Sequence, residues 1–383
     1  MDSQALSPIE CPRPAQGGLV GAPGRAAKGE TMAALPAGKI EEVVHPRSKL
    51  ACPVLPTDEH YLETVAAPAQ ASFNLDIKAV PEIDFESIPP PGSQEAETFA
   101  ASIRSTFFEQ SGCVILRNVY PQKVMDEYNR WCEVHLDEVA QTHANARHPK
   151  QKDKKIINDV LERMSTDRPD LLMTLMNNSG LTSSLDALLG FARFGAVTAH
   201  WIESGGDRQK SHVDYPCHVR SGDFWQDDPK LLSRYFTPHQ LNHVLPHFSV
   251  QALIASDKMG AFNGSTEVVP GSHLIQDVDI KILDPGFYAR MEREFINVDL
   301  NQGDVLLFNR RLVHRGGKNI SAHRRNSLII QAVYLFGIGQ HATDDELVFD
   351  NLKHEMDELA VDNRHEFAMR LRAPYPLNTR DRT

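Results

Sequence analysis

The feature that most constrains the fold is a histidine and an aspartate two positions apart, His212 and Asp214, which follow an apolar segment at 191–203. In extended backbone, residues i and i+2 point to the same side, so an imidazole nitrogen and a carboxylate oxygen are presented together. This pair makes half of a divalent-metal site. The best candidate for the other half is His314, just past a compact apolar strand at 305–308. The fold must therefore bring two strand ends, far apart in the sequence, to one point.

A single His-x-Asp pair is weak evidence, because a chain with 17 His and 51 acidic residues contains such pairs by chance. A second signal is Arg325, eleven residues after His314, with Ser327 at the head of an apolar strand predicted at 327–336. Arg325 and Ser327 share one side of that strand and offer a guanidinium and a hydroxyl to one carboxylate. Two histidines and one aspartate leave three coordination positions open, which is the arrangement of non-haem Fe(II) oxygenases.

Four ordered signals, His212-x-Asp214, the segment 263–273 (NGSTEVVPGSH), Gly303-Asp304 leading to His314, and Arg325, together resemble the phytanoyl-CoA dioxygenase family over roughly residues 95 to 336. The resemblance implies a mainly β (α+β) fold with a double-stranded β-helix, or jelly-roll, core and N-terminal helices. It also implies Fe(II), 2-oxoglutarate and O2. The expected metal ligands and catalytic centre are His212, Asp214 and His314, and the expected 2-oxoglutarate-binding residues are Arg325, Ser327 and Gln251, the last being the polar interruption of an apolar strand predicted at 249–257.

The reaction that the resemblance implies is the hydroxylation, or another oxidation, of an unactivated C–H bond in a small molecule, with release of succinate and CO2. Asp214 argues against halogenation, because related halogenases carry Gly or Ala there. Gly316 departs from family members that have a hydroxyl two residues after the second histidine, which makes Ser327 more important. Arg324 is the alternative to Arg325 as the anchor.

The segment 215–247 has little apolar periodicity and contains several aromatic residues. Loops of this length inside a compact domain are usually functional or disordered, so we predict a substrate lid. Its candidate substrate-contacting residues are Tyr215, Arg220 and Trp225. Basic residues gather around both motifs, and we expect their field to favour an anionic substrate. They are Arg208, Lys210, Arg220, Arg310, Arg311, Arg315, Lys318, Arg324 and Arg325.

Length and composition fit one large catalytic domain at 61–340, because 383 residues with 41% hydrophobic content can bury a sizeable core. We predict a disordered extension at 1–60 and a helical extension at 341–383, which either covers the barrel or forms an oligomer contact. The net charge of −11 argues against nucleic acid and anionic membrane partners. Five scattered cysteines and no apolar run of membrane-spanning length predict a cytoplasmic protein.

Two other functions use the same residues. A cupin-like metal-dependent isomerase or hydrolase would need the metal ligands but not Arg325 and Ser327, so that pair argues against it. A non-catalytic jelly-roll protein that binds a small molecule would not need an intact set of metal ligands.

Overall fold

The computed structural model describes residues 77–90, 93–143, 154–214, 247–274, 291–334 and 345–371 of the chain. The predicted extension at 1–60 lies outside these ranges, as does nearly all of the predicted lid, with Tyr215, Arg220 and Trp225. All described residues belong to one compact unit.

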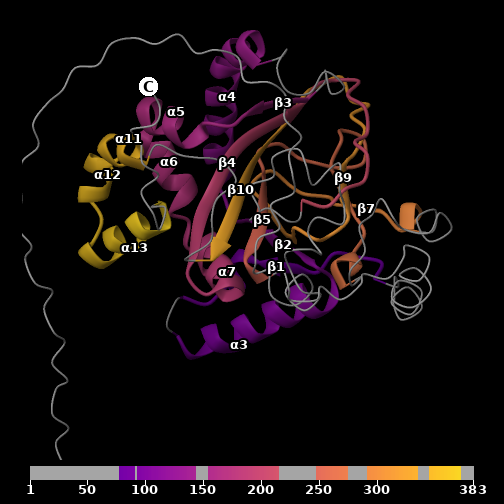
Figure 1. Ribbon diagram of the computed structural model, residues 1–383, viewed down its shortest axis with the longest axis horizontal. Helices are drawn as coiled ribbons and strands as arrows, with labels where there is room; N and C mark the ends of the chain where they lie inside the picture. The colour runs from indigo at the N-terminus through magenta and orange to yellow at the C-terminus, as the bar shows by residue number, and fades with distance from the viewer. Residues whose placement is uncertain are drawn as a thin grey trace, which may run out of the picture. The chain divides into compact units, whose positions relative to one another are not determined.

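The larger of two sheets has seven strands in the order β1-β2-β8-β5-β10-β4-β3, and every pairing in it except β1 with β2 is antiparallel (Figure 1). The long strand β10 lies between β5 and β4 and pairs with both along most of its length. The strands are β1 (Glu82–Asp84), β2 (Cys113–Arg117), β3 (Lys154–Ile157), β4 (Ala192–Ile202), β5 (Ser249–Ala255), β8 (Val305–Asn309) and β10 (Arg325–Tyr334).

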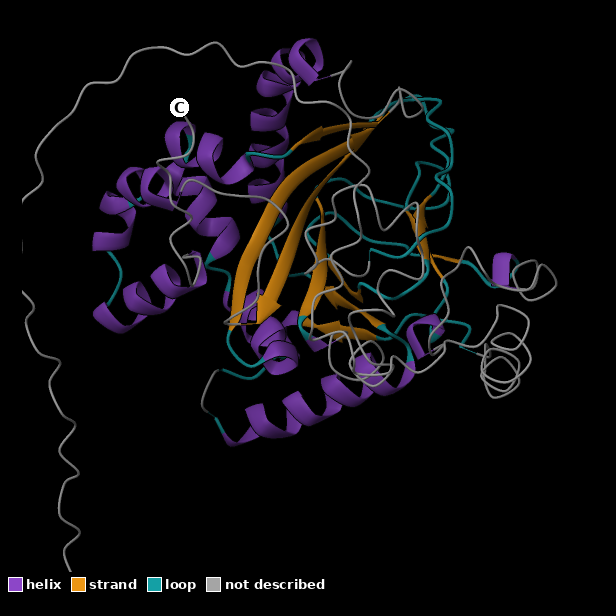
Figure 2. Cartoon of the chain, in the orientation of Figure 1, coloured by secondary structure: helices purple, strands orange, loops and turns teal. Residues whose placement is uncertain are grey.

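The smaller sheet has three antiparallel strands in the order β7-β6-β9, with β6 at Thr266–Val268, β7 at Ile296–Asn297 and β9 at His314–Gly316. It lies apart from the helices, toward the right of the view in Figure 2. The architecture is therefore mixed α/β, with a large sheet between a helical layer and a small second sheet.

Both faces of the large sheet are buried, which explains why its strands read as continuous apolar runs. On β5, Val250, Ala252 and Ile254 belong to the core shared with the helices, whereas Leu253 and Ala255 belong to a second core on the opposite face. Gln251 is on this opposite face, because side chains alternate along a strand. We call that face the site-facing side.

Helices cover the other face of the sheet (Figure 1). The chain order places α4 to α7 before β4 and α11 to α13 after β10. Their bounds are α4 Gln122–His143, α5 Val160–Asp167, α6 Pro169–Met176, α7 Ser179–Leu189, α11 Asp345–Asn351, α12 Lys353–Asp357 and α13 Val361–Leu371; short 3-10 turns occur at Phe85–Ser87 and Ser272–Leu274.

The helix that begins after Ser93 changes type before it ends. Ser93 caps α3 (Gln94–Arg104) by accepting the Ala96 N–H, and a π-helix at Ser105–Gln110 continues it. Gly112 ends the segment with a φ of 76°. Any side chain there would also clash, since a Cβ would lie 2.3 Å from Nδ1 of His273.

The C-terminal helices pack their apolar face on the chain's own core. Val348, Leu352, Met356, Phe367 and Leu371 all belong to the core cluster beneath the large sheet. Of the two predicted roles, covering the sheet is the one these described residues perform. None of the described helices combines the length and apolarity that crossing a bilayer requires.

Candidate metal centre

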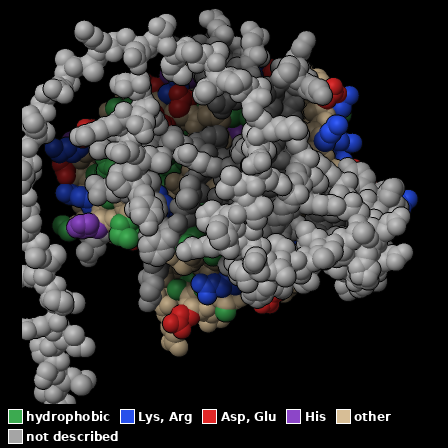
Figure 3. Space-filling view, viewed as in Figure 1, with side chains coloured by type: hydrophobic (Ala, Val, Ile, Leu, Met, Phe, Trp, Pro, Cys, Tyr) green, Lys and Arg blue, Asp and Glu red, His purple; other side chains and the backbone are tan. Residues whose placement is uncertain are grey.

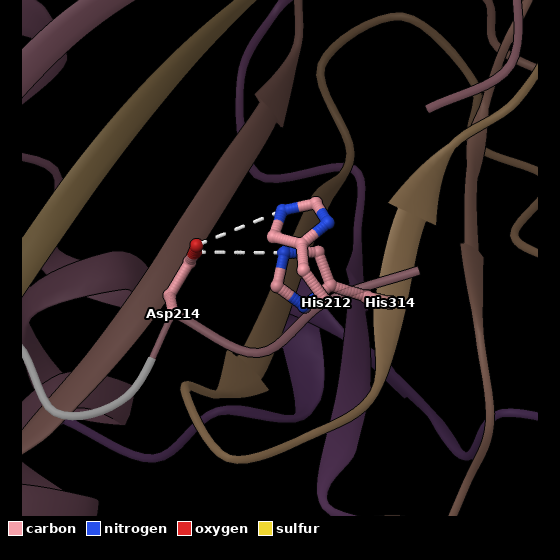
Figure 4. Close-up of side chains that lie close together, drawn as sticks. All are labelled: His212, Asp214 and His314. Carbon is pink, nitrogen blue, oxygen red and sulfur yellow. Dashed lines mark ion pairs between the residues drawn. The ribbon is translucent and has the colours of Figure 1, made fainter. Parts of the chain in front are cut away.

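The structure brings His212, Asp214 and His314 together, and their potential ligand atoms all lie within 4.8 Å of one another. Nε2 of His212 is 3.7 Å from Oδ1 of Asp214, and Nε2 of His314 is 3.5 Å from Oδ2. Figure 4 shows both rings directed toward the carboxylate. Donor atoms about 2.1 Å from one ion lie roughly 3 Å apart when adjacent, so a small closure would place all three around a first-row divalent ion.

Both imidazoles are held in the tautomer that a metal requires. Nδ1 of His212 is 2.9 Å from the Lys210 carbonyl oxygen, and Nδ1 of His314 is 2.9 Å from the Leu312 carbonyl oxygen. A carbonyl only accepts, so each Nδ1 carries the proton and donates it. Each Nε2 therefore presents a lone pair toward Asp214, as the donor set of an Fe(II) site needs.

The charges of the cluster also suit a cation. Burial, together with the neighbouring His314, lowers the pKa of His212 to about 4, so this ring is neutral near pH 7. Burial opposes ionisation of Asp214, but His314, Arg310 and His212 together hold its pKa well below the usual range. A neutral His212 beside an anionic Asp214 gives a site that attracts a divalent cation.

The backbone joins the two ligand-bearing segments directly. His212 and His314 exchange both backbone hydrogen bonds at 3.0 Å, as an isolated antiparallel bridge beside β9. The prediction that His212 lies at the end of a strand was therefore only partly right, because β4 ends at Ile202 and the motif lies in a separate extended segment. Arg310 fixes the end of that segment, since the Asp214 N–H donates to its carbonyl and its Nη2 donates to the Asp214 carbonyl.

Gln251 contacts the candidate ligand set rather than standing apart from it. Its Nε2 donates to Oδ2 of Asp214 over 3.2 Å, from the site-facing side of β5. The amide therefore orients the carboxylate.

Arg325 and Ser327 are on the same side of β10 as Gln251, because β10 pairs with β5 without a break from Ser327 to Gln331, opposite Gln251. Both are buried, with Arg325 4% exposed. Arg325 donates from Nη1 to the Met259 sulfur at 3.2 Å, and its Nε has no partner in the described part of the structure. A buried guanidinium without a carboxylate on it fits an anionic ligand.

Lys154 is a site-facing residue that the sequence did not reveal. It lies on β3 (Lys154–Ile157), which pairs with β4 and has lysine at two of its four positions. Lys154 and Arg325 both lie opposite Ile202, so the two cations share one row across the sheet. Burial, with the charge of Arg325 and against that of Asp214, lowers the pKa of Lys154 to about 8.

The surroundings of Gly316 leave little room for a side chain. Its N–H donates to Oε1 of Gln209 over 2.7 Å, and a Cβ at Gly316 would lie 2.8 Å from the same oxygen. A residue with a hydroxyl would have to displace Gln209.

Several of the basic residues predicted to surround the motifs lie beside acidic side chains. Glu267 accepts from both Arg208 and Arg315, Arg315 also pairs with Glu292, and Lys318 lies near Asp207. Basic and acidic side chains accordingly lie next to one another in the space-filling view, for example at the upper right of Figure 3. These pairs reduce the field of Arg208, Arg315 and Lys318, and the preference for an anionic substrate stays a prediction.

Comparison with known proteins matches the model of the family described as Phytanoyl-CoA dioxygenase (PhyH) to residues 108–327. Dioxygenase aneA of Aspergillus aculeatus is 24% identical over 237 residues, which span 59% of this chain and 71% of that protein. Iron/alpha-ketoglutarate-dependent dioxygenase ausO of Aspergillus calidoustus is 27% identical over 75 residues, which span 20% of this chain and 24% of that protein.

Among solved structures, the non-heme alpha ketoglutarate dependent carbocyclase SnoK from nogalamycin biosynthesis gives a TM-score of 0.46 at 16% identity, over 70% of this chain and 93% of that one. The epimerase SnoN, in complex with Fe3+, alpha ketoglutarate and nogalamycin RO, gives 0.45 at 15% identity, over 64% and 88%.

Proposed function

The chain belongs to the phytanoyl-CoA dioxygenase family, and from that premise we propose that His212, Asp214 and His314 hold the Fe(II) with which it oxidises a small molecule. It is an Fe(II)- and 2-oxoglutarate-dependent dioxygenase. The observation that carries the assignment of the ligands is the pair of fixed tautomers, because both Nε2 lone pairs are directed toward one carboxylate.

When bound, Fe(II) with 2-oxoglutarate and dioxygen would supply the oxidation of an unactivated C–H bond in the substrate, with release of succinate and CO2. The protein's own contribution is to orient the reactants. Gln251 holds the Asp214 carboxylate, and Arg310 holds the backbone of the same residue.

We assign the distal carboxylate of 2-oxoglutarate to Arg325, with Ser327 beside it. Ser327 is 1% exposed, and its hydroxyl lies 3.4 Å from the His200 carbonyl, a long contact that a carboxylate would readily replace. Lys154, in the same row as Arg325, supplies a second positive charge. Two desolvated cations on one face favour a dianion over a neutral or singly charged acid.

The remaining parts are assigned by the family. We propose that the two sheets form the double-stranded β-helix core of an oxygenase domain at 61–340, with residues 215–247 as its lid and Tyr215, Arg220 and Trp225 as substrate-contacting residues. Residues 1–60 and 341–383 would be extensions. The thiols of Cys113 and Cys132 are buried and free, in keeping with a reducing compartment such as the cytoplasm.

The test is an anaerobic titration of the Fe(II)-loaded protein with 2-oxoglutarate, read from the weak visible charge-transfer band of the chelate. We expect a band in the wild type and none in His314→Ala at the same iron concentration. Succinate release then screens small-molecule substrates. Absence of the band from the wild type, with iron shown to be bound, would exclude the oxygenase and favour a cupin-like isomerase or a binding protein.

A further inference from the structure

A network of charged and polar side chains joins the two segments that carry the candidate metal ligands. We call it the clamp: Arg208, Glu267, Arg315, Glu292 and Ser211. Glu267 accepts from Nη2 of Arg208 at 2.9 Å and from Nε of Arg315 at 2.5 Å. Glu292 accepts from Nη1 of Arg315 and, through its other oxygen, from the Ser211 hydroxyl at 2.6 Å.

The clamp is built from the neighbours of the ligands. Arg315 follows His314 on β9, so its side chain points to the opposite side of that strand. Ser211 precedes His212 in extended backbone, so its side chain likewise points to the side opposite the His212 ring. Glu292 is the group that touches both, with one carboxylate oxygen on each side.

Burial makes these contacts stronger than ordinary surface pairs. The Arg315 and Glu267 side chains are 11% and 5% exposed, and Glu267 lies directly opposite Arg315 in the pairing of β6 with β9. The Arg315 guanidinium also stacks on the Phe295 ring, 3.8 Å from its centre. Glu292 itself, at 27% exposed, comes just before β7, which pairs with β6. These contacts fix the conformation of the Arg315 side chain. Glu292 links that side chain to Ser211.

We propose that Glu292 is a positioning residue that holds the His212–Asp214 segment against the His314 strand and so sets the affinity for Fe(II). This inference rests on the proposed function. Without Glu292, the described residues would still link the two segments through the His212–His314 backbone bridge, the contacts of Gln209 and Arg310, and Glu267 between Arg208 and Arg315, but the link from Arg315 to Ser211, next to His212, would be lost. The three ligand atoms would then spend less time within the reach of one ion.

The experiment compares Glu292→Ala and Glu292→Gln with Glu294→Ala in the full chain. Glu294 is the matched control, because it is the same residue type on the same segment and pairs with Lys78, away from the clamp. Two quantities are measured: the anaerobic Fe(II) dissociation constant, and amide hydrogen exchange of residues 211–214 and 314–316 in the metal-free protein.

We expect Glu292→Ala to weaken Fe(II) binding about 10- to 100-fold, as lost outer-shell contacts do, and to speed exchange in both segments. The effects of Glu292→Gln should lie between those of the wild type and Glu292→Ala. Its amide oxygen can still accept from Ser211, but the negative charge that pairs with Arg315 is lost. Glu294→Ala should match the wild type in both measurements.

Unchanged Fe(II) affinity in Glu292→Ala would overturn the inference, and so would an equal loss in Glu294→Ala, which would indicate general destabilisation. If the wild type itself bound no Fe(II), the proposed function would fail. The clamp would then stand or fall on the exchange comparison, which needs no metal.

Discussion

Replacing Arg325 by methionine should weaken 2-oxoglutarate binding and, at the same time, stabilise the protein without its co-substrate. The opposite signs follow from the surroundings of the guanidinium. It is 4% exposed and contacts the Met259 sulfur, and its Nε has no partner among the described residues. A charge in such a place is costly until an anion arrives.

The cost can be sized from the pKa. Burial lowers the pKa of Arg325 from 12.5 to about 10, against the favourable charge of Asp257, and that fall corresponds to about 3 kcal/mol. Because the pKa in the folded state is the lower one, the penalty is fully present below about pH 10 and disappears above the unfolded pKa. Methionine fills similar space without charge, so we expect the free energy of unfolding at pH 7 to rise by about 1–3 kcal/mol.

The loss in binding is the larger effect. Removing one partner of a buried, hydrogen-bonded charge pair costs about 2–5 kcal/mol, so the dissociation constant of 2-oxoglutarate should increase from about 30-fold to several thousand-fold. Anaerobic titration of the charge-transfer band measures the binding, and urea unfolding of the metal-free protein measures the stability.

Arg324→Met is the matched control, because Arg324 is exposed and lines a pocket of about 670 Å³ with Asn129 and Glu133 of α4, on the helical side of the sheet. Neither quantity should change in it. If Arg325→Met kept the 2-oxoglutarate affinity within threefold of the wild type while Arg324→Met lost it, the anchor would be Arg324 and the reasoning from the site-facing side would be wrong.

Three further predictions concern neighbouring residues. As pH rises above about 8, Lys154 loses its charge, so the affinity for 2-oxoglutarate should fall in the wild type but stay level between pH 7 and 9 in Lys154→Met, by titration at each pH. Gln251→Leu removes the donor to Asp214 and should weaken Fe(II) binding about tenfold in anaerobic titration, with little change in thermal stability. Arg370→Met should lower the free energy of unfolding by about 2 kcal/mol in urea without altering 2-oxoglutarate affinity, because this buried side chain joins α13 to Asp186 and to the Ala192 carbonyl.

Strands and ligand candidates were predictable because both depend on local pattern. The apolar run predicted at 249–257 is β5, and the strand predicted at 327–336 is β10, displaced by two residues. His212, Asp214 and His314 were predicted from their spacing, from the position of Arg325 and from the family resemblance, and the structure brings them together. Side-chain alternation then correctly placed Arg325 and Ser327 on one face.

Lys154 could not be found in this way, because β3 has only four residues and two of them are lysines. Its extended conformation depends on pairing with β4, which is a tertiary effect that overrides local preference. For the same reason, the sequence does not show which of the basic residues near the motifs have acidic partners. Sequence displays Arg315 beside the second motif, but not Glu267 and Glu292, which reach it from other parts of the chain.

Together these contacts separate the cations near the centre into two groups. Outside the centre, Arg315 pairs with Glu267 and Glu292, so its charge is balanced there. On the site-facing side, Arg325 and Lys154 lie in one row across the sheet, and the charge of Arg325 helps to lower the pKa of Lys154. A dianion would offset that repulsion and the desolvation penalty of both groups by its own charge, whereas a singly charged acid would offset less. We therefore propose that selectivity for a dicarboxylate co-substrate comes from two cations, the buried Arg325 and the half-buried Lys154, which destabilise each other until it binds.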